Sequence, residues 1–215
     1  MLTITLIIVV ITVLVSLSAF RSEKTMDDLI YYPPAITKGK QYYRFISSGF
    51  IHADIAHLAF NMISFYLFGR YVEEKFIEIF SPGTGKILYL VLYISALFVS
   101  LFPTHLKHRN DHKYRSLGAS GAVSAIVFAG LMIAPYMEVG FFIIPPFIPG
   151  FVFGPLYLII SAYLDRKGGD NINHSAHLWG AVYGVLFLIM VSYAIAGHDA
   201  ISAFVEGIRY YFNSR

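Results

Sequence analysis

Residues 116–125 of this chain read SLGASGAVSA and open a long apolar run. The stretch places Ser120 among small residues at the start of that run. His177 has the same position in the last apolar run of the chain, where residues 176–180 read AHLWG. The interpretation of the whole sequence depends on whether these two side chains can meet.

The composition is that of a membrane protein. Of the 215 residues, 57% are hydrophobic and only 13% are charged, whereas soluble domains carry about 25% charged residues. A soluble chain of this length could not bury so much apolar surface, so we predict an integral membrane protein with one membrane domain over residues 1–215. The chain has no cysteine, and its net charge of +3 is too small to suggest a nucleic-acid partner.

Apolar segments long enough to cross a bilayer predict six transmembrane helices. They cover residues 2–20, 54–69, 86–102, 118–135, 151–164 and 174–196. The first segment could instead be a signal peptide, but it has neither a basic start nor a small-residue cleavage site, so we favour a retained helix. The predicted fold is an all-α bundle of six transmembrane helices.

Two segments outside these spans have features of their own. Residues 21–52 form a polar loop of a length that is usually structured or functional. Residues 197–215 predict an amphipathic helix lying on the membrane, with a frayed end as the alternative. The apolar face of that helix would comprise Ile201, Phe204, Val205, Ile208, Tyr211 and Phe212.

The second, fourth and sixth predicted spans cross the membrane in the same direction, so they begin on the same side. Each carries polar side chains near its start. These are His57 and Asn61 in the second span, Ser120 in the fourth and His177 in the sixth. Polar groups at that depth are costly when they face lipid, so we expect all four to face the bundle interior.

Small residues on the fourth and sixth spans predict that these two helices pack closely. They are Gly121, Ala125 and Ala129 in the fourth span, and Gly180, Ala181 and Gly184 in the sixth. If the two small faces touch, Ser120 and His177 lie at the same end of the contact. Taken alone, Ser120 could be a packing residue and His177 a histidine bonded to a neighbouring helix.

A serine and a histidine in contact would permit nucleophilic catalysis. The serine hydroxyl needs a base to take its proton, and neutral histidine is the usual one. No Asp or Glu lies in the inner part of the spans, which favours a Ser-His dyad over a triad. The backbone N–H groups at Ser120, with His57 and Asn61, could stabilise an oxyanion, unless those two side chains only bond between helices.

These motifs together resemble the rhomboid family of intramembrane serine proteases, over residues 40–195. Residues 118–121 match the family pattern GxSG, residues 176–184 match AHxxGxxxG, and residues 57–61 match HxxxN. His52 also stands at a family position. Tyr43-Arg44 occupies the place where the family usually has Trp-Arg, which is a departure within the first loop.

The resemblance implies that Ser120 is the nucleophile, His177 the base, and His57 and Asn61 oxyanion donors. It also implies a six-helix core over residues 40–196 with residues 197–215 as a tail. The fifth span and the loop over the site would act as a substrate gate. Structural support would come from Arg44, Glu73, Gly118, Gly121, Gly180 and Gly184. No metal or cofactor is expected.

By the same resemblance, the substrates are single-span membrane proteins, and the chain lies in the lipid bilayer of a bacterial inner membrane. A water-filled pocket would open to the extracytoplasmic side. Nothing in the sequence specifies the oligomeric state or the physiological substrate.

Charge gives a conflicting indication of orientation. Loops one, three and five, which are residues 21–52, 103–115 and 165–173, carry 11 of the Lys and Arg residues, and the opposite side carries 5. The 11 are Arg21, Lys24, Lys38, Lys40, Arg44, Lys107, Arg109, Lys113, Arg115, Arg166 and Lys167. The positive-inside rule would place them in the cytoplasm. We follow the resemblance instead, because the rule concerns short flexible flanks and we expect loop one to be structured.

Other classes of protein explain fewer of these features. A non-catalytic rhomboid-like adaptor that binds client helices would lack the serine or the histidine, and this chain has both. The ionisable residues of a transporter should lie near the membrane midplane rather than near one surface. A metal-dependent hydrolase would need ligands from His52, His57, His174 and His177, but the sequence has no HExxH and no carboxylate at ligand spacing.

Overall fold

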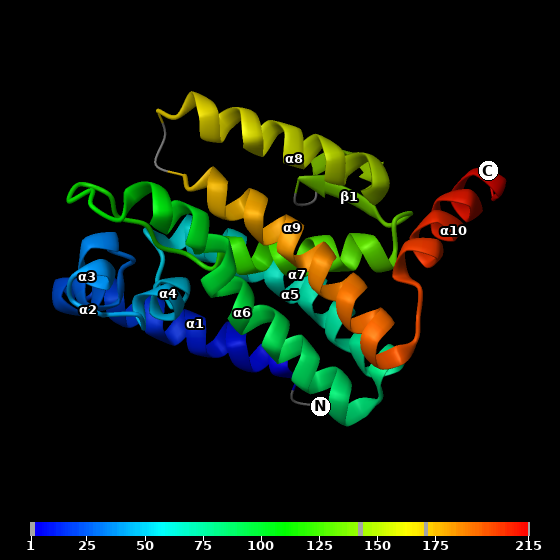
Figure 1. The fold of residues 1–215 in the computed structure, drawn as a ribbon, viewed down its shortest axis with the longest axis horizontal. Helices are drawn as coiled ribbons and strands as arrows, with labels where there is room; N and C mark the ends of the chain where they lie inside the picture. Colours follow the sequence, from blue (N-terminus) through cyan, green and yellow to red (C-terminus); the bar gives the residue numbers. More distant parts are fainter. Residues whose placement is uncertain (1–2, 142–143, 170–171, 215) are drawn as a thin grey trace.

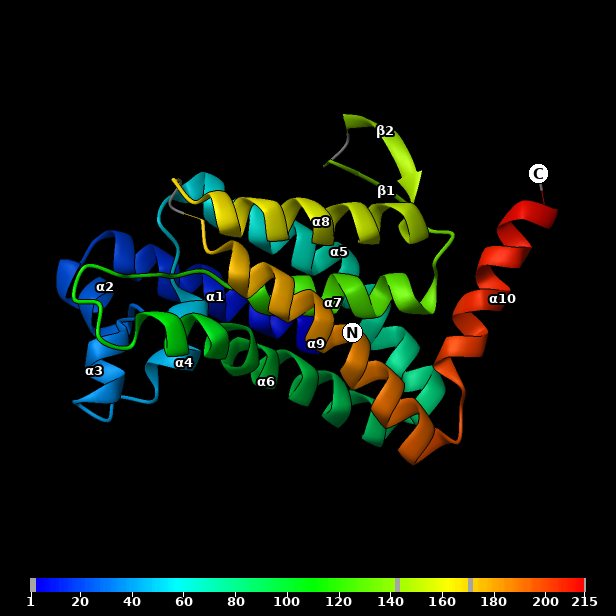
Figure 2. The same cartoon turned by 45° about the horizontal axis from the view of Figure 1, so that its top comes forward.

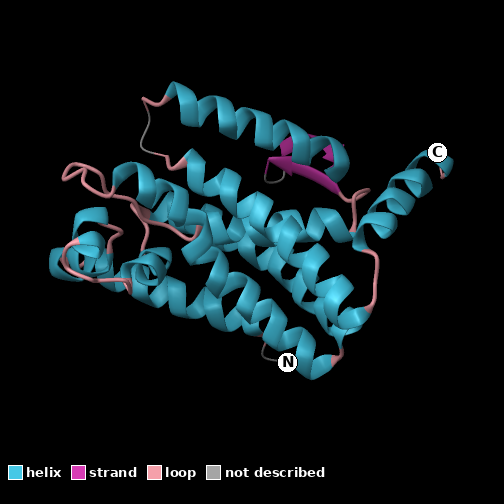
Figure 3. Ribbon diagram, viewed as in Figure 1, coloured by secondary structure: helices cyan, strands magenta, loops and turns pink. Residues whose placement is uncertain are grey.

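A computed structural model describes residues 3–141, 144–169 and 172–214. Leu2, which begins the first predicted span, and Arg215, which ends the predicted tail, lie outside the described residues. The described chain is mostly helical (Figure 3). The helices of the bundle are α1 (Ile4–Phe20), α5 (Ile55–Phe80), α6 (Pro82–His108), α7 (Ser120–Ile133), α8 (Gly150–Lys167) and α9 (His174–Val191). Helix α7 lies at the centre and contacts α5, α6, α8 and α9 (Figure 1).

By length and composition, two helices among the described residues could span a membrane. They are Pro82–His108 and His174–Ala196, the second of which includes the turn after α9. Ile4–Phe20 and Ser120–Ile133 are apolar but shorter. Helices α5 and α8 each end in a charged stretch.

The first loop is structured, as predicted. It contains α2 (Glu23–Leu29), α3 (Pro33–Thr37), α4 (Arg44–Ser47) and a 3-10 turn, η1 (Ser48–Phe50). The chain returns from this loop to begin α5 beside the start of α7.

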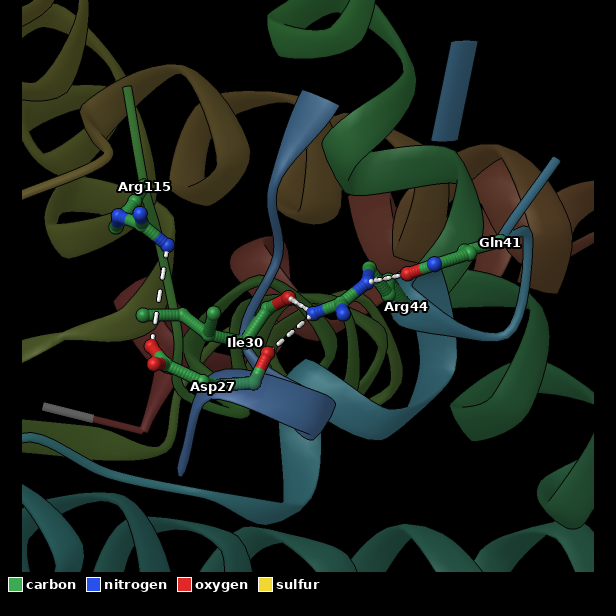
Figure 4. A network of polar contacts seen from close by, with 5 residues as sticks. All are labelled: Asp27, Ile30, Gln41, Arg44 and Arg115. Atoms are coloured by element: carbon green, nitrogen blue, oxygen red, sulfur yellow. Dashed lines mark hydrogen bonds and ion pairs between the residues drawn. The ribbon is translucent and has the colours of Figure 1, made fainter. Parts of the chain in front are cut away.

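Arg44, predicted as a structural residue, holds this loop together (Figure 4). Its Nη1 donates to the carbonyl oxygens of Asp27 and Ile30, both at 2.7 Å, and its Nε donates to Gln41 Oε1 at 2.6 Å. The side chain is buried, so these charge-assisted bonds replace its hydration and join the end of α2 to the start of α4. The hydroxyl of Tyr43 donates to the carbonyl of Asp28 at 3.1 Å.

The second and third predicted spans were too short, because α5 and α6 are longer than their apolar parts. Helix α5 continues through Glu73 and Lys75, which the sequence analysis places beyond the second span, and α6 begins at Pro82 and extends to His108. The break between them falls at Ser81, whose φ of +74° stops α5, followed by a proline at the first position of α6. Hydrophobicity marks the part of a helix suited to lipid, whereas backbone geometry ends the helix.

Glu73 is not in a loop but is a buried residue of α5 that caps α1. Its carboxylate accepts from the backbone N–H groups of Ile4 at 2.8 Å and Thr5 at 2.9 Å, and from the Thr5 hydroxyl at 2.7 Å. A carboxylate at a helix N-terminus satisfies free donors and complements the helix dipole. Glu73 therefore fixes the start of α1 against α5.

The all-α expectation was wrong for the connection between α7 and α8, which forms a hairpin. Strand β1 (Glu138–Phe141) pairs antiparallel with β2 (Ile144–Pro149), and Glu138 lies opposite Pro149. Three prolines between residues 145 and 149 exclude a helix there, because proline has no N–H and a fixed φ. Proline is tolerated at the edge of a sheet, and both strands of a hairpin are edges.

The predicted helix in the tail is present as α10 (Ala200–Asn213). Asp199 caps the N-terminus of α10, because its Oδ1 accepts from the N–H groups of Ile201 and Ser202. A π-helical turn, η2 (Ser192–Ala196), and Gly197 separate α10 from α9. The helix projects from the end of the bundle that is remote from loop one (Figures 1 and 2).

Candidate active site

Helices α7 and α9 are in backbone contact, as the small residues predicted. A methyl group added to Gly180 would overlap the carbonyl oxygen of Gly121, and one added to Gly184 would overlap the carbonyl oxygen of Ala125. Both views show α9 crossing α7 (Figures 1 and 2). Only glycine at these two positions allows this crossing distance.

Ser120 and His177 meet at one end of this contact. Ser120 is the first residue of α7, and His177 lies in the first turn of α9. Ser120 Oγ lies 2.7 Å from His177 Nε2, within the range expected for a nucleophile and its base. Both residues are half-buried, so each remains partly exposed.

The turn before Ser120 requires glycine at residue 118. Gly118 has a φ of +111°, and its N–H donates to the carbonyl of Ser48 in loop one at 2.9 Å. A Cβ there would lie 2.9 Å from His57 Cε1 and 3.0 Å from His57 Nε2. Gly118 therefore permits both an otherwise strained backbone and the close approach of the His57 ring.

His57 and Asn61 lie in the first two turns of α5, on the face toward this turn. Asp54 caps α5 by accepting from the His57 N–H at 2.7 Å. The Ala53 N–H donates to His57 Nδ1 at 3.5 Å, which places the ring proton of a neutral His57 on Nε2. Asn61 is buried, and one of its amide hydrogens is donated to the His57 carbonyl, with Nδ2 at 3.0 Å.

A small cleft lies beside Ser120. Its walls include Gly49, Leu97, Ser100, Gly118 and Asn173. A second, larger cleft lies where α6 and α8 end and α9 begins, and Asn173 lines both. Both clefts lie at the same end of the bundle as the dyad.

Two contacts near the site were missed by the sequence analysis. Ser124, one turn beyond Ser120, lies with its Oγ 3.0 Å from the hydroxyl of Tyr157 in α8. Ser16 in α1 lies with its Oγ 3.0 Å from His52 Nδ1. The sequence does show a tyrosine within an apolar span and hydroxyl residues on one face of α1. Neither feature identifies the side chain that it contacts.

The four histidines of the metal alternative do not gather into a ligand set. His52 and His57 face one another with ring centroids 5.0 Å apart, and His174 and His177 are 5.9 Å apart. In the described parts of the chain, no three His, Asp or Glu side chains are placed to hold a metal ion.

Comparison with known proteins identifies the class. The family model of the Rhomboid domain matches residues 39–194. This chain therefore belongs to the rhomboid family of membrane proteins.

Individual relatives are distant. RHOMBOID-like protein 12, mitochondrial, of Arabidopsis thaliana is 31% identical over 161 residues, which cover 69% of this chain and 46% of that protein. Presenilin-associated rhomboid-like protein A, mitochondrial, of Danio rerio is 27% identical over 146 residues, 66% of this chain and 36% of that protein. Rhomboid protease GlpG of Haemophilus influenzae is 25% identical over 188 residues, 86% of this chain and 88% of that protein. This chain spans less than half the length of the two mitochondrial relatives.

Proposed function

We propose that this protein is an intramembrane serine endopeptidase in which Ser120 is the nucleophile and His177 the general base. The observation that carries the proposal is the 2.7 Å contact between Ser120 Oγ and His177 Nε2. Membership of a family that includes a protein named as a protease supports it.

In the proposed reaction His177 Nε2 takes the proton of Ser120 as Oγ attacks the carbonyl carbon of the scissile peptide bond. The tetrahedral intermediate collapses when the His177 imidazolium gives its proton to the leaving nitrogen, which releases one fragment as an amine. The other fragment stays as an ester on Ser120. Water then attacks the ester, with His177 again as base, and the second fragment leaves as a carboxylic acid.

Three kinds of donor could stabilise the oxyanion of this intermediate. The first turn of α7 has no side-chain cap, so its backbone N–H groups are free of a capping side chain. The His57 tautomer assigned above carries a proton on Nε2, next to the turn that precedes Ser120. Asn61 has a second amide hydrogen besides the one donated to the His57 carbonyl. Donors fixed before the reaction stabilise charge without reorganisation.

We further propose that α1, α5, α6, α7, α8 and α9 all span the membrane, in a single domain. Helix α7 has 14 residues, which is roughly 21 Å of helix, against a hydrocarbon core of about 30 Å. Ser120 would then lie below the surface on the side of loop one, which we take to be extracytoplasmic. The substrates would be single-span membrane proteins, cut where Gly or Pro weakens the helix and exposes the peptide bond.

The proposed membrane is a bacterial inner membrane, and the bacterial relative, aligned over most of both chains, supports this placement. A substrate entering from the bilayer would pass α8, whose interior proline at 155 and exposed apolar residues suit a movable wall.

The test is cleavage of a model transmembrane substrate in detergent by the wild type and by the Ser120→Ala and His177→Ala variants. Ser18→Ala, an exposed serine of α1, is the matched control. We expect the wild type and the control to cut, and both dyad variants to lose cleavage. A serine-directed fluorophosphonate should label Ser120 in the wild type but not in His177→Ala. Cleavage that survives Ser120→Ala, or a wild type that binds such helices without cutting any, would refute the proposal and favour an adaptor.

A further inference from the structure

Loop one places a fully buried histidine between α1 and the turn that carries the dyad serine. His52 is 0% exposed and belongs to no helix, since it follows η1 and precedes the start of α5. Both of its ring nitrogens have partners. Its Nδ1 lies 3.0 Å from Ser16 Oγ, and its Nε2 lies 3.5 Å from the backbone nitrogen of Ala119, the residue before Ser120.

The direction of these hydrogen bonds follows from the donor at one end. The Ala119 N–H can only donate, so His52 Nε2 must carry no proton and accept. The proton of neutral His52 then lies on Nδ1, which donates to Ser16 Oγ. The hydroxyl hydrogen of Ser16 is left for the carbonyl of Phe50, at 2.9 Å. In this series of hydrogen bonds, the Ala119 N–H donates to His52, His52 to Ser16 and Ser16 to the Phe50 carbonyl, so each hydrogen is donated once.

Burial keeps the imidazole in the neutral form that this chain of bonds requires. Desolvation, assisted by the proximity of His57 and opposed by Asp54, lowers the pKa of His52 to about 3. A neutral imidazole has two tautomers, and the hydrogen bond made by one nitrogen selects the state of the other. Without the Ser16 hydroxyl, the Nδ1–H of this tautomer is buried with no acceptor, so the preference for a proton on Nδ1 weakens although the Ala119 N–H still favours it.

The Ala119 end of this series of hydrogen bonds lies next to the proposed nucleophile, Ser120. Two hydrogen bonds hold the turn before Ser120 to loop one. The Gly118 N–H donates to the Ser48 carbonyl, and the Ala119 N–H donates to His52 Nε2. Ala119 immediately precedes α7, so its orientation sets the direction in which the first helical residue presents its side chain.

We propose that Ser16 is a positioning residue for the reaction, acting through the tautomer of His52 on the turn that carries Ser120. The expected effect of Ser16 on kcat rests on the proposed function, whereas the tautomer of His52 does not depend on that function. Ser16 lies in α1, so the first helix would contribute to the active site without touching substrate.

The chain offers a matched control on the same helix. Thr12 is as buried as Ser16, at 0% exposure for each, and its hydroxyl interacts with the Tyr93 hydroxyl of α6 rather than with His52. Ser16→Ala and Thr12→Val each remove a buried hydroxyl and leave the remaining side chain nearly unchanged in volume. A general destabilisation of α1 would affect both variants, whereas loss of positioning would affect only Ser16→Ala.

The kinetic test compares kcat and KM of these two variants with the wild type, at a temperature where all three are folded. We expect Ser16→Ala to lower kcat about tenfold, the scale of one lost hydrogen bond, with KM within about twofold. Thr12→Val should keep kcat within about twofold. A wild-type kcat in Ser16→Ala, or equal losses of kcat in the two variants, would refute the inference.

A second measurement needs no activity and remains valid if the proposed protease function fails. Nitrogen NMR of histidine-labelled protein in lipid nanodiscs, assigned with a His52→Gln variant, reports which ring nitrogen carries the proton. We expect His52 to be protonated on Nδ1 in the wild type and in Thr12→Val, and to be a mixture of tautomers in Ser16→Ala. His52 protonated on Nε2 in the wild type would overturn the inference, even if Ser16→Ala does not fold.

Discussion

At the residue scale, the side chains around Ser120 are fixed mainly by backbone groups. His57 is held by the N–H of Ala53, and Asn61 by the carbonyl of His57. His52 holds the N–H of Ala119. Backbone partners are set by the fold and do not change rotamer, so the donors of the proposed oxyanion site are in place before substrate arrives.

Asn61→Ala should lower kcat by about 10- to 100-fold with KM within about twofold, because a donor used mainly in the transition state is lost. The loss should be smaller than in Ser120→Ala, since backbone donors of α7 remain. Ser64→Ala, one turn further along the same face of α5, is the control. An unchanged kcat in a His57→Ala, Asn61→Ala double variant would remove both residues from the mechanism.

His52 makes stability depend on pH. Its pKa of about 3 in the folded protein is below the ordinary 6.5 of the unfolded chain. The unfolded state therefore binds more protons below pH 6.5, and stability falls as the pH falls toward 3. The loss should reach about 2 kcal/mol between pH 6.5 and pH 5, at 1.36 kcal/mol per unit. Thermal unfolding in detergent should show this slope in the wild type and a flatter one in His52→Gln, and equal slopes would contradict the assignment.

At the element scale, two contacts position the helices that carry the site. Glu73 joins the start of α1 to α5 through three hydrogen bonds, and Gly180 and Gly184 bring α9 onto α7. The first contact is polar and lies at the end of the bundle remote from Ser120, while the second consists of backbone packing. They should therefore respond differently to substitution.

Glu73→Gln should destabilise the protein by about 2 kcal/mol, because a neutral amide cannot accept from all three donors and loses the charge at the helix start. Glu74→Gln changes the same side chain at the next, exposed position and should have little effect. Unfolding by heat in detergent would measure both. Cleavage per folded molecule should stay unchanged in each, so a catalytic defect in Glu73→Gln with normal stability would contradict this role.

Gly184→Leu should abolish cleavage although Ser120 and His177 are both present, because a side chain at residue 184 would meet the Ala125 carbonyl and separate α9 from α7. Gly83→Leu is the matched control, since a Cβ at Gly83 meets nothing within 4 Å. Cleavage assays and fluorophosphonate labelling of Ser120 would measure the outcome. Normal labelling in Gly184→Leu would show that the helix contact does not position the dyad.

At the scale of the whole molecule, the orientation in the membrane depends on how the charges of the loops are weighed against the folding of loop one. Charge would place the side of loop one in the cytoplasm, with 11 of the 16 Lys and Arg residues on that side. The structure weakens this argument, since loop one is folded into helices and Arg44 is buried in hydrogen bonds to backbone carbonyls. The positive-inside rule concerns charges in flexible segments that flank a span, so a charge such as Arg44, which is hydrogen-bonded within a folded loop, carries less weight.

We therefore expect the dyad side to be extracytoplasmic and both ends of the chain to be cytoplasmic. A reporter that is active only in the cytoplasm, fused after Arg215, should be active in a bacterial host. The same reporter inserted after Lys113, in the loop that precedes α7, should be inactive. The reverse pattern would overturn the proposed orientation.

Much of the site was determined by the sequence alone. Composition indicated a membrane protein, and the shared depth of Ser120 and His177 with the small residues around them predicted that these side chains meet. These inferences succeed because helical periodicity is local, so the residues on one face of a helix are known once the helix is known. The same reasoning located His57 and Asn61 on one face of α5.

The tertiary structure decided the contacts that local periodicity does not encode. Ser16 and His52 are 36 residues apart and Thr5 and Glu73 are 68 apart, and in each case a polar side chain of α1 meets one from a distant part of the sequence. The hairpin after α7 and the full lengths of α5 and α6 also required the fold. A buried polar group needs some partner, but only the packing of the helices determines which one lies within reach.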